Sequence, residues 1–260
     1  MDIFTRVIAE IKTGIEAKDY AKNKKSIRAL MLAMDLEFKE ATDESYAPHP
    51  SYQSHLEKCK KDFLNYIASD YQSDTKRLLG IGDSILAQSR DDVKSVLDKR
   101  LNYSLGGMRA CHMLQLLKDL DSTMKKYKFV PNSILVGTPG GNNLLQHQKI
   151  EVVISEVNAL LNYIRKRFPT TKIVLYSIPL TIVDYVIANY TAYTQNMVSW
   201  MIKDGNAVMI PFIKNFVAAW HIFMKADYSA DGVHLSPIGR AYFCDLIKRS
   251  LKGRPGQFIN

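Results

Sequence analysis

The spacing of apolar residues divides the chain into two parts. Up to about residue 75, apolar residues recur at intervals of three and four, as in Ile27, Leu30, Met31, Met34 and Phe38. The same spacing returns after the proline-containing stretch 45–54, in Leu56, Cys59, Phe63, Tyr66 and Ile67. This period predicts amphipathic helices, and prolines interrupt them. We therefore expect residues 1–75 to form an N-terminal helical extension of two or three helices, with its apolar stripe packed on the rest of the chain.

From Lys76 onward, short apolar runs alternate with longer stretches of helical period. The runs expected to be strands are RLLGIG (77–82), LNYSL (101–105), SILVG (133–137), KIVLYSI (172–178) and AVMIPF (207–212). The expected helices cover approximately 84–99, 107–127, 144–168, 184–203 and 236–251. This alternation is typical of an α/β domain, here residues 76–260, with a parallel sheet covered by helices on both faces.

In such sheets, ligands bind beyond the carboxyl ends of the strands. The first expected strand ends in GIGDS (80–84), which would leave the Ser84 hydroxyl exposed at the sheet edge; Asp83 or Ser84 could equally be an ordinary helix cap. The second runs into SLGGM (104–108), where glycine lets a backbone N–H approach a ligand and where a simple turn would use the same residues. Both loops are therefore candidates for a site.

Two further loops carry polar side chains. GTPGGNN (137–143) presents the carboxamides of Asn142 and Asn143, either of which could instead cap the next helix. SADGVHLS (229–236) places the carboxylate of Asp231 three positions before the imidazole of His234. A D-x-x-H spacing alone is common, so its meaning depends on the other loops.

Together, the four loops could supply every group that acyl transfer requires. Ser84 would be the nucleophile, His234 the base that takes its proton, and Asp231 the group that orients the base. The oxyanion hole would be formed by the Ser84 N–H, the Gly107 N–H and the Asn142 carboxamide.

This ordered set resembles the sequence blocks of the SGNH or GDSL hydrolases. GIGDS is similar to the first block, NYSLGG to the second, GGNN to the G-x-N-D third block and DGVHLS to the fifth. The resemblance covers about 77–251 and implies a flavodoxin-like three-layer α/β/α sandwich with a mainly parallel five-stranded sheet. It also implies a serine esterase that forms an acyl-enzyme without a metal or an organic cofactor.

The sequence departs from the family pattern around the expected oxyanion hole. Asn143 stands where the family usually has aspartate, and residues 137–139 lengthen the approach to it. Ser104 and Met108 stand where the second block often has glycine and aspartate. An asparagine at 143 keeps the size and the hydrogen-bonding capacity of aspartate without its charge, so the loop could hold its shape while Asn142 is displaced.

Charge narrows the range of partners. The formal net charge is +9, with 13 basic and 13 acidic residues in 1–78 and 22 against 13 in 79–260. Such an excess favours an anionic substrate, a membrane surface or nucleic acid. Nucleic acid is not expected, because zinc-finger spacing and aromatic RNA-binding motifs are missing from the sequence.

Cysteine content and hydropathy bear on compartment. Three cysteines without C-x-x-C spacing predict free thiols rather than a disulfide framework or a zinc site. The sequence has no apolar run of membrane-spanning length, and its first residues carry charges throughout. We expect a chain without a membrane span that is cytoplasmic or released without a visible signal peptide.

Three functions remain open at this level. The first is a serine esterase acting on a small acyl ester, such as an O-acetyl group on a carbohydrate. The second is a binding or structural component of a larger assembly that keeps the hydrolase scaffold with little turnover. The third is a lipid-directed esterase. The sequence leaves the natural substrate, the oligomeric state and the purpose of residues 1–75 undetermined.

Overall fold

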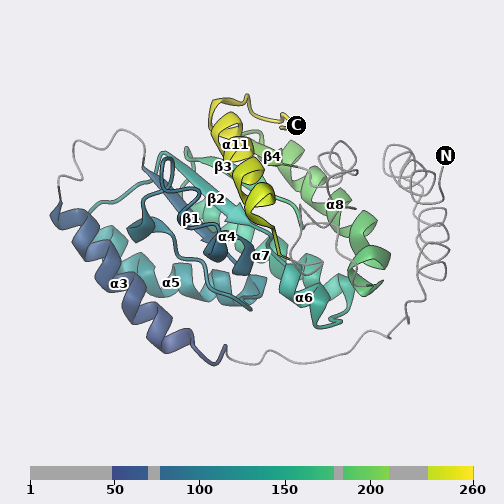
Figure 1. Cartoon of the computed structure of the whole chain (residues 1–260), viewed down its shortest axis with the longest axis horizontal. Coiled ribbons are helices and arrows are strands. Elements are labelled where there is room, and N and C mark those ends of the chain that lie inside the picture. The colour runs from purple at the N-terminus through teal and green to yellow at the C-terminus, as the bar shows by residue number, and fades with distance from the viewer. Residues whose placement is uncertain (1–48, 70–76, 179–183, 211–233, 260) are drawn as a thin grey trace.

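The computed structural model describes residues 49–69, 77–178, 184–210 and 234–259 of the 260-residue chain. At its centre lies a parallel sheet in the order β1 (Leu78–Gly82), β2 (Ser133–Gly137), β3 (Lys172–Tyr176) and β4 (Ala207–Ile210) (Figure 1). Successive side chains on a strand point to opposite faces, and every residue of β1 and β4 is buried. Both faces of the sheet are therefore covered, which confirms the predicted α/β class and explains why the strands read as continuous apolar runs.

The expected strand at 101–105 is only partly extended. The 3-10 helix η1 (Lys99–Leu101) occupies its start, and the Asn102 side chain accepts a hydrogen bond from the Ser104 N–H at 3.3 Å. Such local bonds compete with regular pairing. The segment still runs along β1, because the Tyr103 N–H donates to Gly80 O at 2.8 Å and the Leu105 N–H to Gly82 O at 3.2 Å. It adds a fifth, irregular member beside β1, giving the flavodoxin-like strand order.

Two helix predictions were wrong in extent. Helix α4 (Ser84–Gln88) ends well before the expected residue 99. Directly after it, the Ser89 hydroxyl donates back to Ile85 O at 2.7 Å. The single helix expected over 144–168 is two helices, α6 (Gly141–Leu145) and α7 (Ile150–Arg167). Between them His147 has a left-handed φ of 59°, which helices do not continue through.

The other three helices of the main domain lie close to their expected ranges. They are α5 (Ala110–Lys126), α8 (Asp184–Asp204) and α11 (Pro237–Lys252). Helix α11 packs on β3 and β4, α4 packs on β1, and α7 lies between α5 and α8 (Figure 1). In the part of the chain that the structure describes, no helix is both long enough and apolar enough to cross a membrane.

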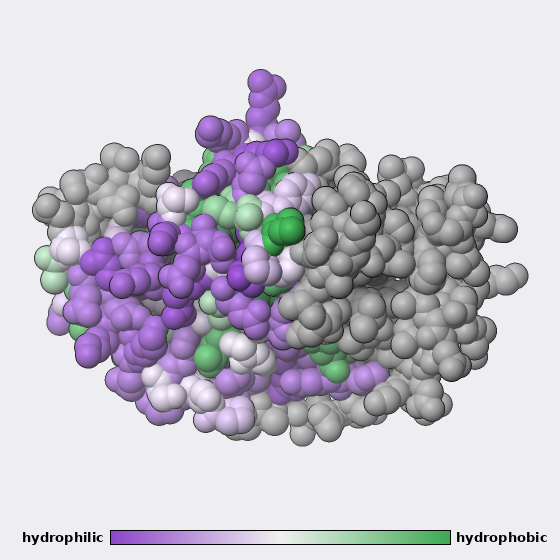
Figure 2. Space-filling view, viewed as in Figure 1, coloured by the Kyte–Doolittle hydropathy of each residue, from purple (hydrophilic) through white to green (hydrophobic). Residues whose placement is uncertain are grey.

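Helix α3 (Tyr52–Ala68) is the described part of the N-terminal extension. Its buried residues are His55, Leu56, Cys59, Phe63 and Tyr66, and it packs against α5 and η1. The Phe63 ring meets Phe129 edge to face at 5.2 Å, and the Tyr52 hydroxyl donates to Asp119 of α5 at 2.6 Å. For α3, the apolar stripe packs on the rest of the described chain as predicted, and the surface over α3 and α5 is largely hydrophilic (Figure 2). The helices expected before residue 49 lie outside the described residues.

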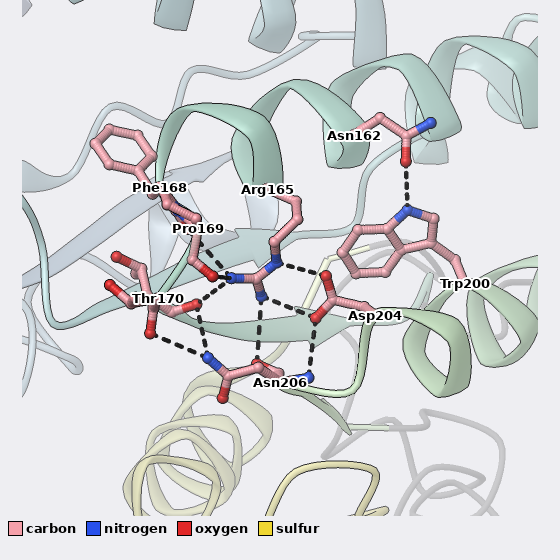
Figure 3. Close-up of polar contacts among 9 residues, drawn as sticks. Asn162, Arg165, Phe168, Pro169, Thr170, Trp200, Asp204 and Asn206 are labelled. Carbon is pink, nitrogen blue, oxygen red and sulfur yellow. Dashed lines mark hydrogen bonds and ion pairs between the residues drawn. The ribbon is translucent and has the colours of Figure 1, made fainter.

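A partly buried ion pair fixes α7 and α8 at the amino ends of β3 and β4 (Figure 3). The Arg165 guanidinium binds the Asp204 carboxylate at 2.5 and 2.8 Å, and the side chain of Asp204 is only 1% exposed. The same guanidinium donates to backbone carbonyl oxygens of Phe168, Pro169, Thr171 and Asn206. A planar, multiply bonded guanidinium of this kind orders the chain just before each strand, at the end of the sheet opposite the loops considered next.

Candidate active site

Ser84 and His234 meet at the carboxyl end of β1. Ser84 is the first residue of α4, and His234 lies three residues before α11. His234 Nε2 is 2.9 Å from Ser84 Oγ, although the two residues are 150 positions apart in the sequence. Both are partly exposed. When the imidazole is neutral with its proton on Nδ1, the serine hydroxyl donates to Nε2, which is the arrangement of a nucleophile and its base.

The turn from β1 into α4 places Ser84 at the sheet edge. Gly82 ends the strand, and a Cβ at this position would lie 3.1 Å from Gly137 O and 3.2 Å from Leu86 Cβ. Asp83 then caps the helix, because its Oδ1 accepts the Ile85 N–H at 3.0 Å. The capping and the nucleophile interpretations of Asp83-Ser84 are thus compatible, because Asp83 is the cap and Ser84 is the candidate nucleophile.

The amino end of α11 holds the residues next to His234. Ser236 caps the helix by accepting the Gly239 N–H at 3.1 Å, and Pro237 occupies its first position. Arg240 donates to Leu235 O at 3.1 Å and pairs with Asp92 at 3.0 Å. His234 is therefore followed by a rigid segment, while Asp231 lies outside the described residues and its orienting role stays a prediction.

The second loop lies directly beside the serine. A Cβ built on Gly106 would be 3.7 Å from Ser84 Cβ. Gly107 has a φ of +80°, a conformation that residues with side chains rarely adopt. The structure thus places the Gly106–Gly107 pair next to Ser84, where the oxyanion hole is expected.

The third loop is bonded to the second. Asn142, partly exposed, donates from Nδ2 to Met108 O at 3.0 Å. A Cβ on the preceding Gly141 would lie 3.2 Å from Asp83 Oδ2, so the start of α6 lies against the residue before the serine. A carboxamide nitrogen carries two hydrogens, so one bond to Met108 O leaves the second N–H able to donate elsewhere.

Asn143 joins three helices from a fully buried position. Its Oδ1 accepts the Ala110 N–H of α5 at 3.1 Å, and its Nδ2 donates to Glu156 of α7 at 2.7 Å. Glu156 also accepts the Cys111 N–H at 3.3 Å. Asn143 of α6 and the carboxylate of Glu156 on α7 are thus bonded to each other and to the start of α5. Glu156 was not predicted, because nothing in the sequence distinguishes it from other glutamates on an amphipathic helix.

Asp83, directly before Ser84, has a strongly perturbed carboxyl group. It is buried, and burial raises its pKa from 3.8 to about 6 despite the opposing effects of the Ile85 N–H and the nearby His234. Asp83 is therefore partly protonated in mildly acidic solution. The sequence pointed to Asp83 only through its position directly before Ser84.

Other potential binding features lie apart from this site. Among the residues that the structure describes, no three His, Cys, Asp or Glu side chains are grouped to hold a metal ion. The three cysteines are free thiols, as predicted. A cavity of about 480 Å³ lies at the amino ends of β1 and β2, between Arg77, Leu78, Ser133 and the last turn of α11.

Comparisons with known proteins address the fold. No protein-family model matches the sequence, and a search of curated proteins finds no match. Among solved structures, a GDSL-like lipase from Bacteroides thetaiotaomicron has a TM-score of 0.55 and 14% identity, over 75% of this chain and 98% of that one. A protein assigned as a GDSL-like lipase from Parabacteroides merdae has a TM-score of 0.51 and 19% identity, over 67% and 94%. The chain has the SGNH/GDSL hydrolase fold.

A third similar structure is a protein from Streptococcus pneumonia assigned as a platelet activating factor. Its TM-score is 0.51 at 18% identity, over 86% of this chain and 97% of that one. The structural similarity establishes the SGNH fold. Because the sequence identities are low, the chemistry has to be argued from the side chains of the present chain.

The pKa of Asp83 predicts how stability depends on pH. Its value is higher in the folded state than in the unfolded state, so the stabilisation is complete below about pH 4 and is lost as the pH rises through 6. A shift of about two units corresponds to roughly 3 kcal/mol. Asp83→Asn keeps an oxygen for the Ile85 N–H but cannot ionise. Urea unfolding of both proteins between pH 4 and pH 7.5 should show this decline in the wild type alone; identical pH profiles would contradict it.

The contact between Asn143 and Glu156 predicts that the family's usual residue is unfavourable here. Asn143→Asp would place two carboxylates within hydrogen-bonding distance of each other in a largely buried site, costing about 2–3 kcal/mol at neutral pH. The folded variant pair should bind a proton at a higher pH than the two separate carboxylates of the unfolded chain, so the loss should shrink as the pH falls. Adding Glu156→Gln should restore part of the stability, because its amide can donate to the newly introduced carboxylate while the Cys111 N–H loses the oxygen that it now binds. Thermal unfolding that leaves the single variant as stable as the wild type at pH 7.5 would rule out this account.

Proposed function

We propose that this protein is a serine esterase in which Ser84 is the nucleophile and His234 the general base. The observation that carries the proposal is the 2.9 Å contact between Ser84 Oγ and His234 Nε2 at the carboxyl end of a parallel sheet. The SGNH fold supports it by analogy, and GIGDS resembles the first block of that family, which carries the serine.

The first half-reaction follows from the geometry of this pair. His234 Nε2 takes the hydroxyl proton as Ser84 Oγ bonds to the ester carbonyl carbon, and the carbonyl π electrons move to the oxygen. The proposed donors for this oxyanion are the Ser84 N–H, the Gly107 N–H and the second N–H of Asn142. Asp231 is proposed to orient the imidazole and to stabilise its charged form.

Collapse of the tetrahedral intermediate completes the acylation. The bond to the leaving oxygen breaks, His234 gives its proton to the departing alcohol, and an acyl-enzyme remains on Ser84. Water then attacks the acyl carbon with His234 as the base, and the carboxylic acid is released with Ser84 restored. Each proton travels through His234, so the scheme requires neither a metal nor an organic cofactor.

The substrate proposed is a small acyl ester, with an O-acetyl group on a carbohydrate as the leading example. The formal charge of +9 favours substrates on anionic polymers, since a positive field concentrates negatively charged ligands. The preference for anionic polymers rests on the charge of the chain, and it is separate from the assignment of the catalytic pair.

Hydrolysis of p-nitrophenyl acetate tests the catalytic pair. Ser84→Ala should lower kcat/KM by at least about 10³-fold, because it removes the hydroxyl proposed to form the acyl-enzyme. Ser54→Ala, on the exposed side of α3, is the matched control and should retain full activity. Equal activity in wild type and Ser84→Ala would refute the proposal, and a folded but inactive wild type would favour the binding role instead. Faster turnover of long acyl chains would redirect the substrate assignment to lipid.

A further inference from the structure

His49, just before α3, contacts the loop that lies beside Ser84. Its Nε2 is 2.8 Å from Gly106 O, and the Ser51 N–H donates to its Nδ1 at 3.2 Å. A carbonyl oxygen can only accept, so Nε2 carries the hydrogen, whereas Nδ1 accepts and must be unprotonated. The two bonds thus select the neutral Nε2–H tautomer and use both ring nitrogens.

The carbonyl that His49 binds belongs to the same peptide group as the Gly107 N–H. A peptide group is planar, and no cis peptide bond occurs in the described chain, so its N–H points away from its C=O. Fixing Gly106 O therefore fixes the direction of the Gly107 N–H. This N–H is the donor that the proposed function assigns to the oxyanion hole.

A peptide between two glycines needs such a restraint. Neither Gly106 nor Gly107 has a Cβ to limit rotation, and Gly106 is exposed. The imidazole also lies against the second glycine, because a Cβ on Gly107 would be 3.1 Å from His49 Nε2. The ring thus restrains this peptide both by hydrogen bonding and by contact.

His49 is itself held by the main domain. The Tyr52 N–H donates to His49 O at 2.9 Å, and the Tyr52 hydroxyl binds Asp119 of α5 at 2.6 Å. The His49 ring meets His112 edge to face at 5.6 Å, and His112 Nδ1 accepts the Arg109 N–H at the start of α5. Helices α3 and α5, which lie side by side in Figure 1, together place the imidazole over the glycine loop.

We propose that His49 is a positioning residue for the oxyanion hole, holding the Gly106–Gly107 peptide with its N–H directed for catalysis. The inference rests on the proposed esterase function. A hydrogen bond to the carbonyl also polarises the peptide and strengthens the same N–H as a donor. The end of the N-terminal extension would thereby contribute to transition-state stabilisation as well as to packing.

Steady-state hydrolysis of p-nitrophenyl acetate by His49 variants tests this role. Loss of a whole oxyanion donor costs about 10²–10³ in kcat, so a donor that is misdirected part of the time should cost about tenfold. We expect His49→Ala to lower kcat by about this factor with KM within about twofold, because the interaction strengthens in the transition state. His49→Gln keeps a side-chain N–H donor and should recover most of the loss.

Phe63→Leu is the matched control, since it weakens the packing of α3 on Phe129 at a position away from His49 and the glycine loop. It should lower the melting temperature and leave kcat unchanged. Full kcat in His49→Ala, or an equal loss of kcat in Phe63→Leu, would overturn the role of His49 while Ser84→Ala remains inactive. If Ser84→Ala were as active as the wild type, the esterase proposal itself would fail, and the role of His49 with it.

Discussion

The register between β1 and β2 is the constraint on which the site depends. It sets Gly82 opposite Gly137 at the carboxyl ends of the strands, and Leu86 packs over both glycines. A side chain on either glycine would crowd Leu86, whereas their absence lets α4 turn down onto the sheet immediately after β1. Ser84 occupies the first residue of that turn, so its hydroxyl emerges at the edge where the other loops converge.

Behind the partly exposed groups lies a buried polar layer that connects the loops. Asp83 caps α4 and touches the start of α6, while Asn143 links α6 to α5 and to Glu156 of α7. Buried polar groups that are fully bonded impose a specific geometry, because breaking any one bond leaves another group unsatisfied. Asn143 thus bonds to both neighbouring helices without the charge of the family's usual aspartate, and the third loop contacts the second.

Much of this arrangement could be predicted from sequence because parallel strands have a simple rule. Buried strands read as apolar runs, and their carboxyl ends meet at one edge, so Ser84 and His234 were expected to lie close together. The short extent of α4 was missed because the Ser89 hydroxyl bonds locally to Ile85 O, and because Asp92 pairs with Arg240 of α11 through a tertiary contact. The irregular segment at 102–105 was likewise missed because Asn102 bonds locally.

Residues that act from other elements gave no comparable signal. Glu156 lies on an ordinary amphipathic helix, and His49 lies between two prolines in a stretch that reads only as a helix break. Their importance depends on which backbone groups they meet in the folded chain. Asp231 was predicted from its spacing to His234, and it remains a prediction because it lies outside the described residues.

Covalent labelling tests the central claim that His234 activates Ser84. The folded protein would be treated with a fluorophosphonate and digested, and the adduct located by mass spectrometry, in wild type and in His234→Gln. The account predicts one adduct, on the peptide that contains Ser84, forming at least about 10²-fold more slowly in the variant because the general base is lost. Absence of an adduct in the wild type, an adduct on another serine, or an equal rate in His234→Gln would contradict it.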